Sequence, residues 1–193
     1  MAPGVGVGVS SAFHQHRPAV IERAYDAGIL LAGVVDLVGK TVVGDRIRLI
    51  EPAWQAILDV LEKDPSAAFQ IKPRKWEELV AAAYDAEGFE VDLTPRSGDG
   101  GVDVIATLPS GPRVRIFDQV KAYGRGNLVP ANDVRALMGV VAHSDATKGV
   151  VTTTSDFAPR IREDKYIADA LRKGLELVNG DALRQRLQKL RKK

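Results

Sequence analysis

The stretch from residue 97 to residue 121 gathers the side chains best suited to metal chemistry. It reads SGDGGVDVIA, then a turn at Pro-Ser-Gly-Pro, then RVRIFDQVK. Asp103 stands in a β-branched run, where a charge is costly unless it has a partner or a metal. With no cysteine in the chain and no cluster of histidines, a metal site must use carboxylates, amide oxygens and backbone carbonyls, ligands that suit Mg²⁺ or Mn²⁺.

Side-chain alternation along the strand expected over residues 113–121 sharpens this site. Gln119 and Lys121 point to one side and Asp118 to the other. The turn before this strand brings it back beside Asp103, so that a carboxylate, an amide oxygen and an ammonium converge. Asp118 has the wrong parity unless a β-bulge intervenes, and its favoured interpretation is a partner for a basic residue on the far face.

A helix is expected at residues 73–87, with Trp76, Leu79, Val80 and Ala83 on its buried stripe and Gly88 as a left-handed cap. At about 100° per residue, Glu77 borders the sheet whereas Glu78 points to solvent. Glu77 therefore has two interpretations, which stay open. It reaches the site directly or through a water, or it is a carboxylate that favours the helix dipole.

The remaining pattern downstream of residue 66 alternates strands and helices. Strands are expected at 90–94, 102–108, 113–121, 149–154 and 175–178, and helices around 134–141, at 157–171 and at 181–190, the last capped by Asp181. A meander followed by crossover units predicts an α/β fold, a mixed β-sheet with helices on both faces.

The first 66 residues predict a small α+β region of unknown role. An extended arm over residues 1–12 precedes a helix at 17–30, a hairpin formed by 33–43 and 46–50 with Gly44-Asp45 as its turn, and a helix at 52–62. Because Lys63-Asp64-Pro65-Ser66 breaks that helix, we place a domain boundary there, with residues 67–193 as the main domain.

Composition bounds the protein's class. The 193 residues, 45% hydrophobic and 27% charged, are typical of a globular chain and argue against disorder and against a membrane protein. The absence of cysteine excludes disulfides, zinc ribbons, iron–sulfur ligation and thiol catalysis, and leaves the cytoplasm as the expected location. The net charge of +2 is small, and its positive excess lies after residue 66, partly in a basic tail.

Two sequence patterns resemble functional motifs but lack part of what those motifs require. The run from Gly33 to Thr41 resembles a phosphate-binding loop, but five residues separate Gly33 from Gly39 where that motif has four, and no helix is expected after it. No nucleotide cofactor is therefore expected. His14 and His16 share a face of an extended arm, but no third ligand is visible.

Six segments in order resemble the Mrr-like restriction endonuclease catalytic domain, a member of the PD-(D/E)xK nucleases. They are WEELV at 76–80, GFEV at 88–91, SGDGGVDVIA at 97–106, QVK at 119–121, GVVTTTSDFA at 149–158 and LELVNG at 175–180. The resemblance covers about residues 70–190 and implies a restriction-endonuclease-like fold. Many Mrr-like members have Gln where the motif has an acid, as this chain does.

The resemblance implies an Mg²⁺-dependent DNA endonuclease of the restriction or defence type, with Mn²⁺ as an alternative metal. Asp103 would be the principal metal ligand, Gln119 and the Val120 carbonyl further ligands, Lys121 the catalytic lysine, and Glu77 the helix glutamate. A Gln in place of an acid removes one negative charge from the site and should weaken metal affinity. Whether Asp118 or Asp99 compensates stays open, Asp99 being favoured as a turn residue.

DNA contacts are expected from Tyr123, Arg125 and Arg135, beside the proposed site. Ser155 is expected to cap a helix. Cutting both strands usually needs two active sites, so the resemblance implies a homodimer. The alternative function is a non-catalytic DNA-binding or assembly module that retains the nuclease fold, and a nuclease acting on RNA or on junctions stays open as well.

Overall fold

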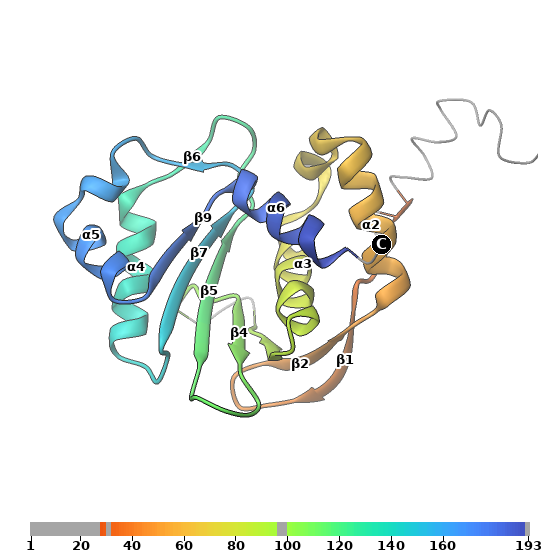
Figure 1. The fold of residues 1–193 in the computed structure, drawn as a ribbon, viewed down its shortest axis with the longest axis horizontal. Coiled ribbons are helices and arrows are strands. Elements are labelled where there is room, and N and C mark those ends of the chain that lie inside the picture. Colours follow the sequence, from red (N-terminus) through yellow and green to blue (C-terminus); the bar gives the residue numbers. More distant parts are fainter. Residues whose placement is uncertain (1–27, 30–31, 96–99, 192–193) are drawn as a thin grey trace, which may run out of the picture.

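The computed structural model describes residues 28–29, 32–95 and 100–191, and these form one seven-stranded mixed sheet with helices on both sides (Figure 1). The strand order is β1-β2-β3-β4-β5-β7-β9; neighbours are antiparallel from β1 to β5 and parallel from β5 to β9. The strands are β1 (Val35–Lys40), β2 (Asp45–Leu49), β3 (Glu90–Leu93), β4 (Val104–Thr107), β5 (Arg115–Lys121), β7 (Lys148–Thr153) and β9 (Leu175–Val178).

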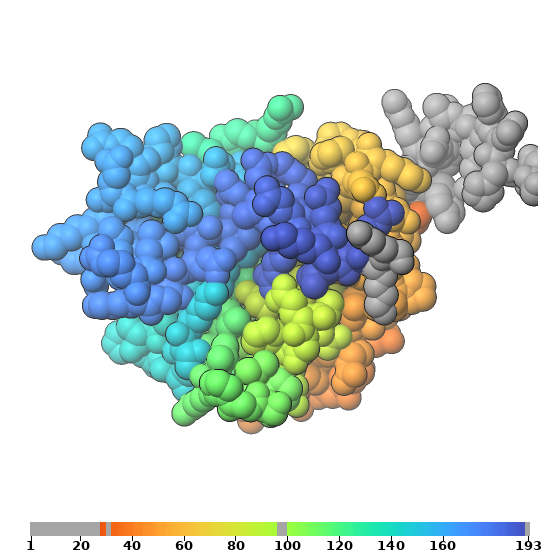
Figure 2. Space-filling view, viewed as in Figure 1, coloured from red at the N-terminus to blue at the C-terminus, as the bar shows by residue number. Residues whose placement is uncertain are grey.

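Two hydrophobic cores lie on opposite faces of this sheet. On one face α2 (Glu51–Lys63), α3 (Pro73–Ala86) and α6 (Gly180–Leu190) pack together, and Figure 2 shows α6 lying across α2 and α3. The other face carries α4 (Ala131–Ala142) and α5 (Lys165–Arg172). The predicted α/β architecture, a mixed sheet flanked by helices, is confirmed.

Helix α3 follows its sequence closely. Pro73 stands at its first position, and the predicted stripe of Trp76, Leu79, Val80 and Ala83 is buried. Gly88 has φ +91°, as its predicted role as a left-handed cap requires. The helix is therefore anchored along the face of the sheet, with its N-terminus at the end where β3 finishes and β4 begins.

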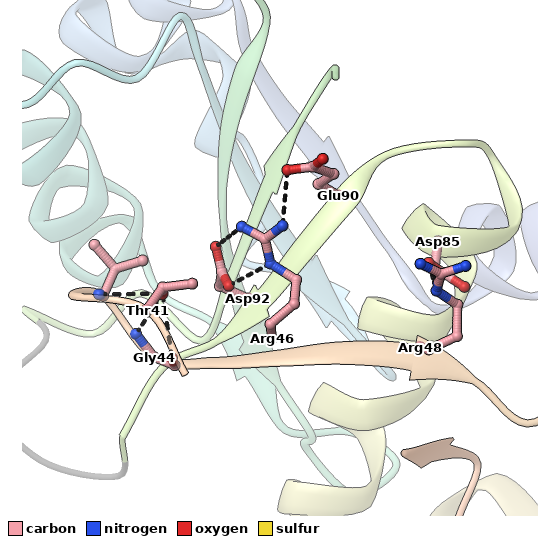
Figure 3. Close-up of polar contacts among 8 residues, drawn as sticks. Thr41, Gly44, Arg46, Arg48, Asp85, Glu90 and Asp92 are labelled. Atoms are coloured by element: carbon pink, nitrogen blue, oxygen red, sulfur yellow. Dashed lines mark hydrogen bonds and ion pairs between the residues drawn. The ribbon is translucent and has the colours of Figure 1, made fainter. Parts of the chain in front are cut away.

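The predicted N-terminal hairpin forms as β1 and β2, joined by a turn that starts at Thr41, earlier than predicted. Gly44 is packed so tightly that an added Cβ would lie 2.2 Å from the Leu93 carbonyl oxygen. Beside it, Arg46 on β2 donates from Nε to Asp92 at 2.7 Å and from Nη1 to Glu90 at 2.7 Å (Figure 3). The hairpin thus extends the main sheet.

The described part of residues 1–66 also shares a core with the rest of the chain. Trp54 and Ile57 of α2 belong to the same buried cluster as Trp76 and Leu79 of α3. The domain boundary near residue 66 is not tested by this packing and stays a prediction.

The segment predicted as a helix over 157–171 is corrected by the structure. It consists of a two-residue strand β8 (Asp156–Phe157), a 3₁₀ turn η3 (Ile161–Glu163) and then α5, which Asp164 caps by accepting from two backbone amides. Arg160 adopts φ +62°, a left-handed conformation that a continuous helix does not allow. Pro159 also disfavours helical backbone in the residue before it.

Three smaller features differ from the sequence expectations. Helix α6 is capped by Asn179, whose Oδ1 accepts from the Ala182 amide, and not by Asp181. A 3₁₀ turn η2 (Pro65–Gln70) follows α2, and a second sheet pairs β6 (Leu128–Val129) with β8. No helix in the described part of the chain is long and apolar enough to cross a membrane. The predictions for Asp99, His14, His16 and the N-terminal arm lie outside the described residues.

Candidate active site

Asp103 lies immediately before β4, at the edge where β4 meets β5. Its backbone N–H donates to the Asp118 carbonyl at 3.0 Å, although Asp118 is already the register partner of Val104, so the pairing is irregular at this step. Its carboxylate Oδ2 accepts from the Val120 backbone N–H at 2.7 Å. The carboxylate is therefore fixed against the β5 backbone, between the residues that carry the Gln119 and Lys121 side chains.

The predicted side-chain alternation of β5 is confirmed. Ile116 and Val120 belong to the core beneath α3, and Phe117 belongs to the core on the α4 side. Gln119 and Lys121 share the parity of Phe117 and so face the α4 side. Asp103 lies just outside β4, where strict alternation no longer holds, because Val102 packs in the core on the α4 side although Val104 packs in the core beneath α3. The structure thus brings Asp103, Gln119 and Lys121 to one end of the sheet, with Gln119 and Lys121 on the α4 side.

Gln119 carries an unusual buried acceptor. The residue is 6% exposed, and its Oε1 has no hydrogen-bond partner among the described residues. Gly101, at φ +88°, packs against the amide so closely that an added Cβ would lie 2.4 Å from Nε2. A buried amide oxygen without a donor costs free energy of about 1–3 kcal/mol, so its place in this site needs a reason beyond stability.

Lys121 ends β5 and is only partly exposed. Its Nζ lies 3.5 Å from Oδ2 of Asp133, in the first turn of α4. The same Oδ2 accepts from the Tyr123 hydroxyl at 3.0 Å. Sequence reasoning did not single out Asp133; its signal is an acid just inside the helix that follows the predicted catalytic strand.

Asp118 faces the opposite side, as its parity predicted. Its Oδ2 accepts from the Tyr84 hydroxyl at 3.0 Å and from Thr152 Oγ1 at 2.9 Å, while Oδ1 has no partner among the described residues. Complete burial raises the pKa of Asp118 to about 7, against hydrogen bonds from Thr152 and Tyr84 and the positive charge of Arg186. Its direct partners are hydroxyls and not the expected basic residue.

Helix α6 reinforces this buried network. Arg186 places its guanidinium over the Tyr84 ring, 4.1 Å from the centroid, and binds both oxygens of Glu87 at 2.8 and 2.7 Å. The sequence analysis missed Tyr84, Thr152 and Arg186. The charge of Asp103 adds to the raised pKa of Asp118, and whether Asp118 assists a metal stays a prediction.

Glu77 lies at the same end of the sheet but pairs with Arg74. Arg74 Nη1 lies 2.6 Å from Glu77 Oε2 and 3.2 Å from the Thr94 carbonyl, next to the start of β4. Thr94 Oγ1 in turn donates to the Val102 carbonyl at 2.5 Å. Arg74 thus links Glu77 to the ends of β3 and β4, and the contact of Glu77 with a substrate or a metal stays a prediction.

The residues predicted to contact DNA have different surroundings. Arg125 is exposed in the loop between β5 and β6, whereas the Tyr123 hydroxyl is taken by Asp133. Arg135 bonds to Asn132 at 2.7 Å and is ion-paired with Asp164 of the α5 cap. Ser155 does not cap a helix: its carbonyl accepts from the Gly180 amide at 2.8 Å.

The donor set fits a hard divalent cation. Within the described residues there is no group of three or more His, Asp or Glu side chains that could hold a metal. The carboxylate of Asp103, the unpartnered oxygen of Gln119 and the Val120 carbonyl are instead three neutral or anionic oxygens of the kind Mg²⁺ prefers. The Gln119 oxygen, buried without a donor, is the observation that favours a metal.

Residues 69–187 match the family model Mrr_cat, described as "Restriction endonuclease". An uncharacterized protein of Sinorhizobium fredii, y4cE, is 29% identical over 99 residues, 51% of this chain and 25% of that protein. The type IV methyl-directed restriction enzyme EcoKMrr of Escherichia coli is 27% identical over 119 residues, 59% of this chain and 37% of that protein.

Among solved structures, the MspJI restriction endonuclease in complex with a 27-mer oligonucleotide superposes with a TM-score of 0.46 at 21% identity, covering 72% of this chain and 31% of that one. The DNA modification-dependent restriction endonuclease AspBHI gives 0.48 at 20% identity, covering 98% and 40%. The chain thus spans between a quarter and two fifths of the length of these proteins.

Proposed function

Because this chain belongs to the Mrr_cat restriction endonuclease family, we propose that it is a metal-dependent DNA endonuclease that hydrolyses phosphodiester bonds in a restriction or defence system. One observation carries the proposal beyond the family: Asp103, Gln119 and Lys121 lie at one end of the sheet, with the Gln119 oxygen buried and without a donor among the described residues. A chain that had lost catalysis would have no reason to keep that costly acceptor.

Each residue has a distinct part in this chemistry. Asp103, Gln119 and the Val120 carbonyl would hold Mg²⁺, which when bound would supply a Lewis acid for the scissile phosphate and the attacking water. Lys121 orients that water and stabilises the negative charge that develops on the phosphate in the transition state. Gln119 leaves the site with less negative charge than a second carboxylate would, so we expect weak metal affinity and activity at millimolar Mg²⁺.

The family, and a relative whose name describes methyl-directed restriction, support DNA as the substrate class. We propose duplex DNA as the partner, contacted first by exposed Arg125 and, once its ion pair with Asp164 opens, by Arg135. Mn²⁺ as an alternative metal, a homodimer that cuts both strands, and a cytoplasmic location belong to the same proposal.

The test is cleavage of supercoiled plasmid, unmodified or cytosine-methylated, with Mg²⁺, Mn²⁺ or EDTA. Wild type is compared with Lys121→Ala and Asp103→Ala, and with Asp145→Asn as a matched control. Asp145 is a carboxylate in a surface ion pair with Arg113 and Arg115, outside the proposed site. We expect metal-dependent nicking or linearisation that both site variants abolish and the control retains.

The outcome that contradicts the proposal is equally concrete. If no metal supports cleavage of either plasmid, while gel shifts reveal salt-sensitive binding, the chain is a DNA-binding or assembly module that retains the nuclease fold. Cleavage of structured RNA or of a four-way junction in preference to plasmid would keep the chemistry and change the substrate.

A further inference from the structure

A carboxylate that neither the sequence nor the family match assigns stands beside the proposed catalytic lysine. Asp133 Oδ2 lies 3.5 Å from Lys121 Nζ and accepts a hydrogen bond from the Tyr123 hydroxyl at 3.0 Å. Both charged side chains are about one quarter exposed, at 24% and 25%. The pair is therefore open to substrate on one side and sheltered enough to be less screened than a surface ion pair.

The backbone around Lys121 is firmly held, but its side chain needs a separate anchor. The Lys121 carbonyl accepts from Thr153 Oγ1 at 2.8 Å and from the Thr154 amide at 3.3 Å, and the Tyr123 carbonyl accepts from Thr154 Oγ1 at 2.8 Å. These bonds fix the backbone position of Lys121. Four rotatable bonds still separate Cα from the ammonium, and a flexible ammonium loses conformational entropy when it must meet a transition state.

Asp133 itself is anchored from two directions. It lies in the first turn of α4, and its backbone N–H donates to the Pro130 carbonyl at 3.2 Å. The Tyr123 hydroxyl fixes the orientation of the carboxylate, and partial burial together with Asp133 raises the pKa of Tyr123, so the phenol remains a donor at neutral pH. The carboxylate therefore has a defined position before substrate arrives.

We propose that Asp133, locked by the Tyr123 hydroxyl, is a positioning residue that holds the Lys121 ammonium toward the scissile phosphate. This inference rests on the proposed nuclease function. It assigns Tyr123 to the support of Asp133 and not to the DNA contact predicted from the sequence. An ammonium has three donors, so one held by Asp133 leaves two for the phosphate and the attacking water.

The direct test is single-turnover cleavage by the full chain at varied DNA and varied Mg²⁺ concentrations. For Asp133→Asn we expect the rate at saturating DNA to fall about 10- to 100-fold, because a misplaced group forfeits part of its transition-state contact. The half-saturating concentrations of DNA and Mg²⁺ should stay unchanged. Asp133→Glu, with the carboxylate retained on a longer side chain, should recover part of the rate.

Tyr123→Phe should lower the same rate about 3- to 10-fold, because it removes one hydrogen bond that orients the carboxylate. The double variant Tyr123→Phe with Asp133→Asn should be no slower than Asp133→Asn alone, because both residues act through one group. Asp145→Asn, which breaks an ion pair remote from the site, is the matched control and should retain the wild-type rate.

A second readout needs no cleavage. Acetylation of lysines by a succinimidyl ester, followed by peptide mass spectrometry, reports how firmly Lys121 is held; exposed Lys165 serves as the internal reference. In Asp133→Asn we expect Lys121 to react about 3-fold faster or more, since it has lost its ion pair. If wild type cuts nothing with any metal, the proposed function fails, and the positioning of Lys121 is decided by this measurement alone.

Four results overturn the inference. Wild-type rates in Asp133→Asn would make the contact incidental. A higher Mg²⁺ requirement would make Asp133 a metal ligand. Unchanged acetylation of Lys121 would mean that Asp133 does not hold it. A loss of thermal stability with an unchanged rate would assign Asp133 to the α4 dipole instead.

Discussion

Asp103 and Asp118 are hydrogen-bonded to each other through their backbones, yet their carboxylates have different surroundings. The Asp103 N–H donates to the Asp118 carbonyl, but the Asp103 carboxylate accepts from the Val120 amide, whereas the Asp118 carboxylate accepts from Tyr84 on the α3 side. Asp103 lies at the end of the sheet that also carries Gln119 and Lys121. Asp118 meets two hydroxyls, below an arginine stacked on tyrosine.

Both residues are aspartates, so their different surroundings come from their positions in the sheet and not from the residue type. Asp118 is completely buried, with its Oδ2 bonded to two hydroxyls and its Oδ1 without a partner among the described residues, and this burial favours a protonated carboxyl. Gln119, on the opposite face of β5, likewise carries an acceptor that no described group satisfies. The two faces differ in their neighbours: hydroxyls surround Asp118, whereas the Gln119 face also carries the Lys121–Asp133 ion pair.

The largest expected effect is the loss of cleavage when Asp103 is replaced. Asp103→Asn should lower plasmid cleavage at least about 1000-fold, because a neutral amide replaces the single carboxylate ligand proposed for the metal. Asp118→Asn, with the same change of charge one step along the ladder, should stay within about 3-fold of wild type. Equal losses in both variants, measured on the same plasmid at saturating Mg²⁺, would contradict a division of roles by face.

The sequence predicted this division because it depends on local rules. Alternation along β5 and the turn before it were enough to place Gln119 and Lys121 beside Asp103, and the apolar stripe of α3 was enough to place that helix. Those features are set by the period of the strand and of the helix. The helix predicted over residues 157–171 was wrong, because Arg160 in a left-handed conformation interrupts an otherwise helical pattern.

Contacts made across the fold could not be predicted in the same way. Tyr84 and Arg186 lie 34 and 68 positions from Asp118 in the sequence and meet it only after α3 and α6 pack on one face. Asp133 reaches Lys121 through the crossover from β5 to α4. Such pairs depend on helix placement to within a few ångströms, and one sequence carries no signal for that.

The next largest effect concerns Gln119, a proposed metal ligand, and the Mg²⁺ concentration that cleavage requires. Gln119→Glu should lower the Mg²⁺ concentration for half-maximal cleavage by roughly 10-fold, because a second negative charge faces the cation. Gln119→Leu should abolish cleavage and yet raise stability, because it removes the buried oxygen without a donor. Urea denaturation of both variants provides the control. A destabilised Gln119→Leu would mean that the oxygen has an unseen partner in the apo protein.

The third effect concerns Asp118, on the α3 side of β5, and the pH dependence of the protein's stability. The folded-state pKa of Asp118 is raised to about 7, so the folded protein holds this proton where the unfolded chain has released it. Its protonated form is compatible with the fold at low pH, and stability should fall as pH rises from about 4 to about 7, by a few kcal/mol at most. Asp118→Asn should flatten this slope between these pH values.

The control for that experiment is Asp145→Asn, whose exposed carboxylate should leave the slope as it is in wild type. Stability is measured by urea unfolding at several pH values. A wild-type stability that rises steadily between pH 4 and pH 7, with the same rise in Asp118→Asn, would show that Asp118 ionises normally in the fold.

The smallest effect concerns the hydroxyl that reaches Asp118 from α3. Tyr84→Phe keeps the ring on which Arg186 stacks and removes one donor at 3.0 Å, so we expect a loss of about 1–3 kcal/mol in the free energy of unfolding. The loss should be larger at pH 8 than at pH 5, because the bond is stronger to a charged carboxylate than to a neutral one. Cleavage by Tyr84→Phe should stay near wild type at temperatures where it is folded, because the hydroxyl acts on the structural face of β5. A selective loss of cleavage in this variant would couple the two faces and remove the division between Asp103 and Asp118.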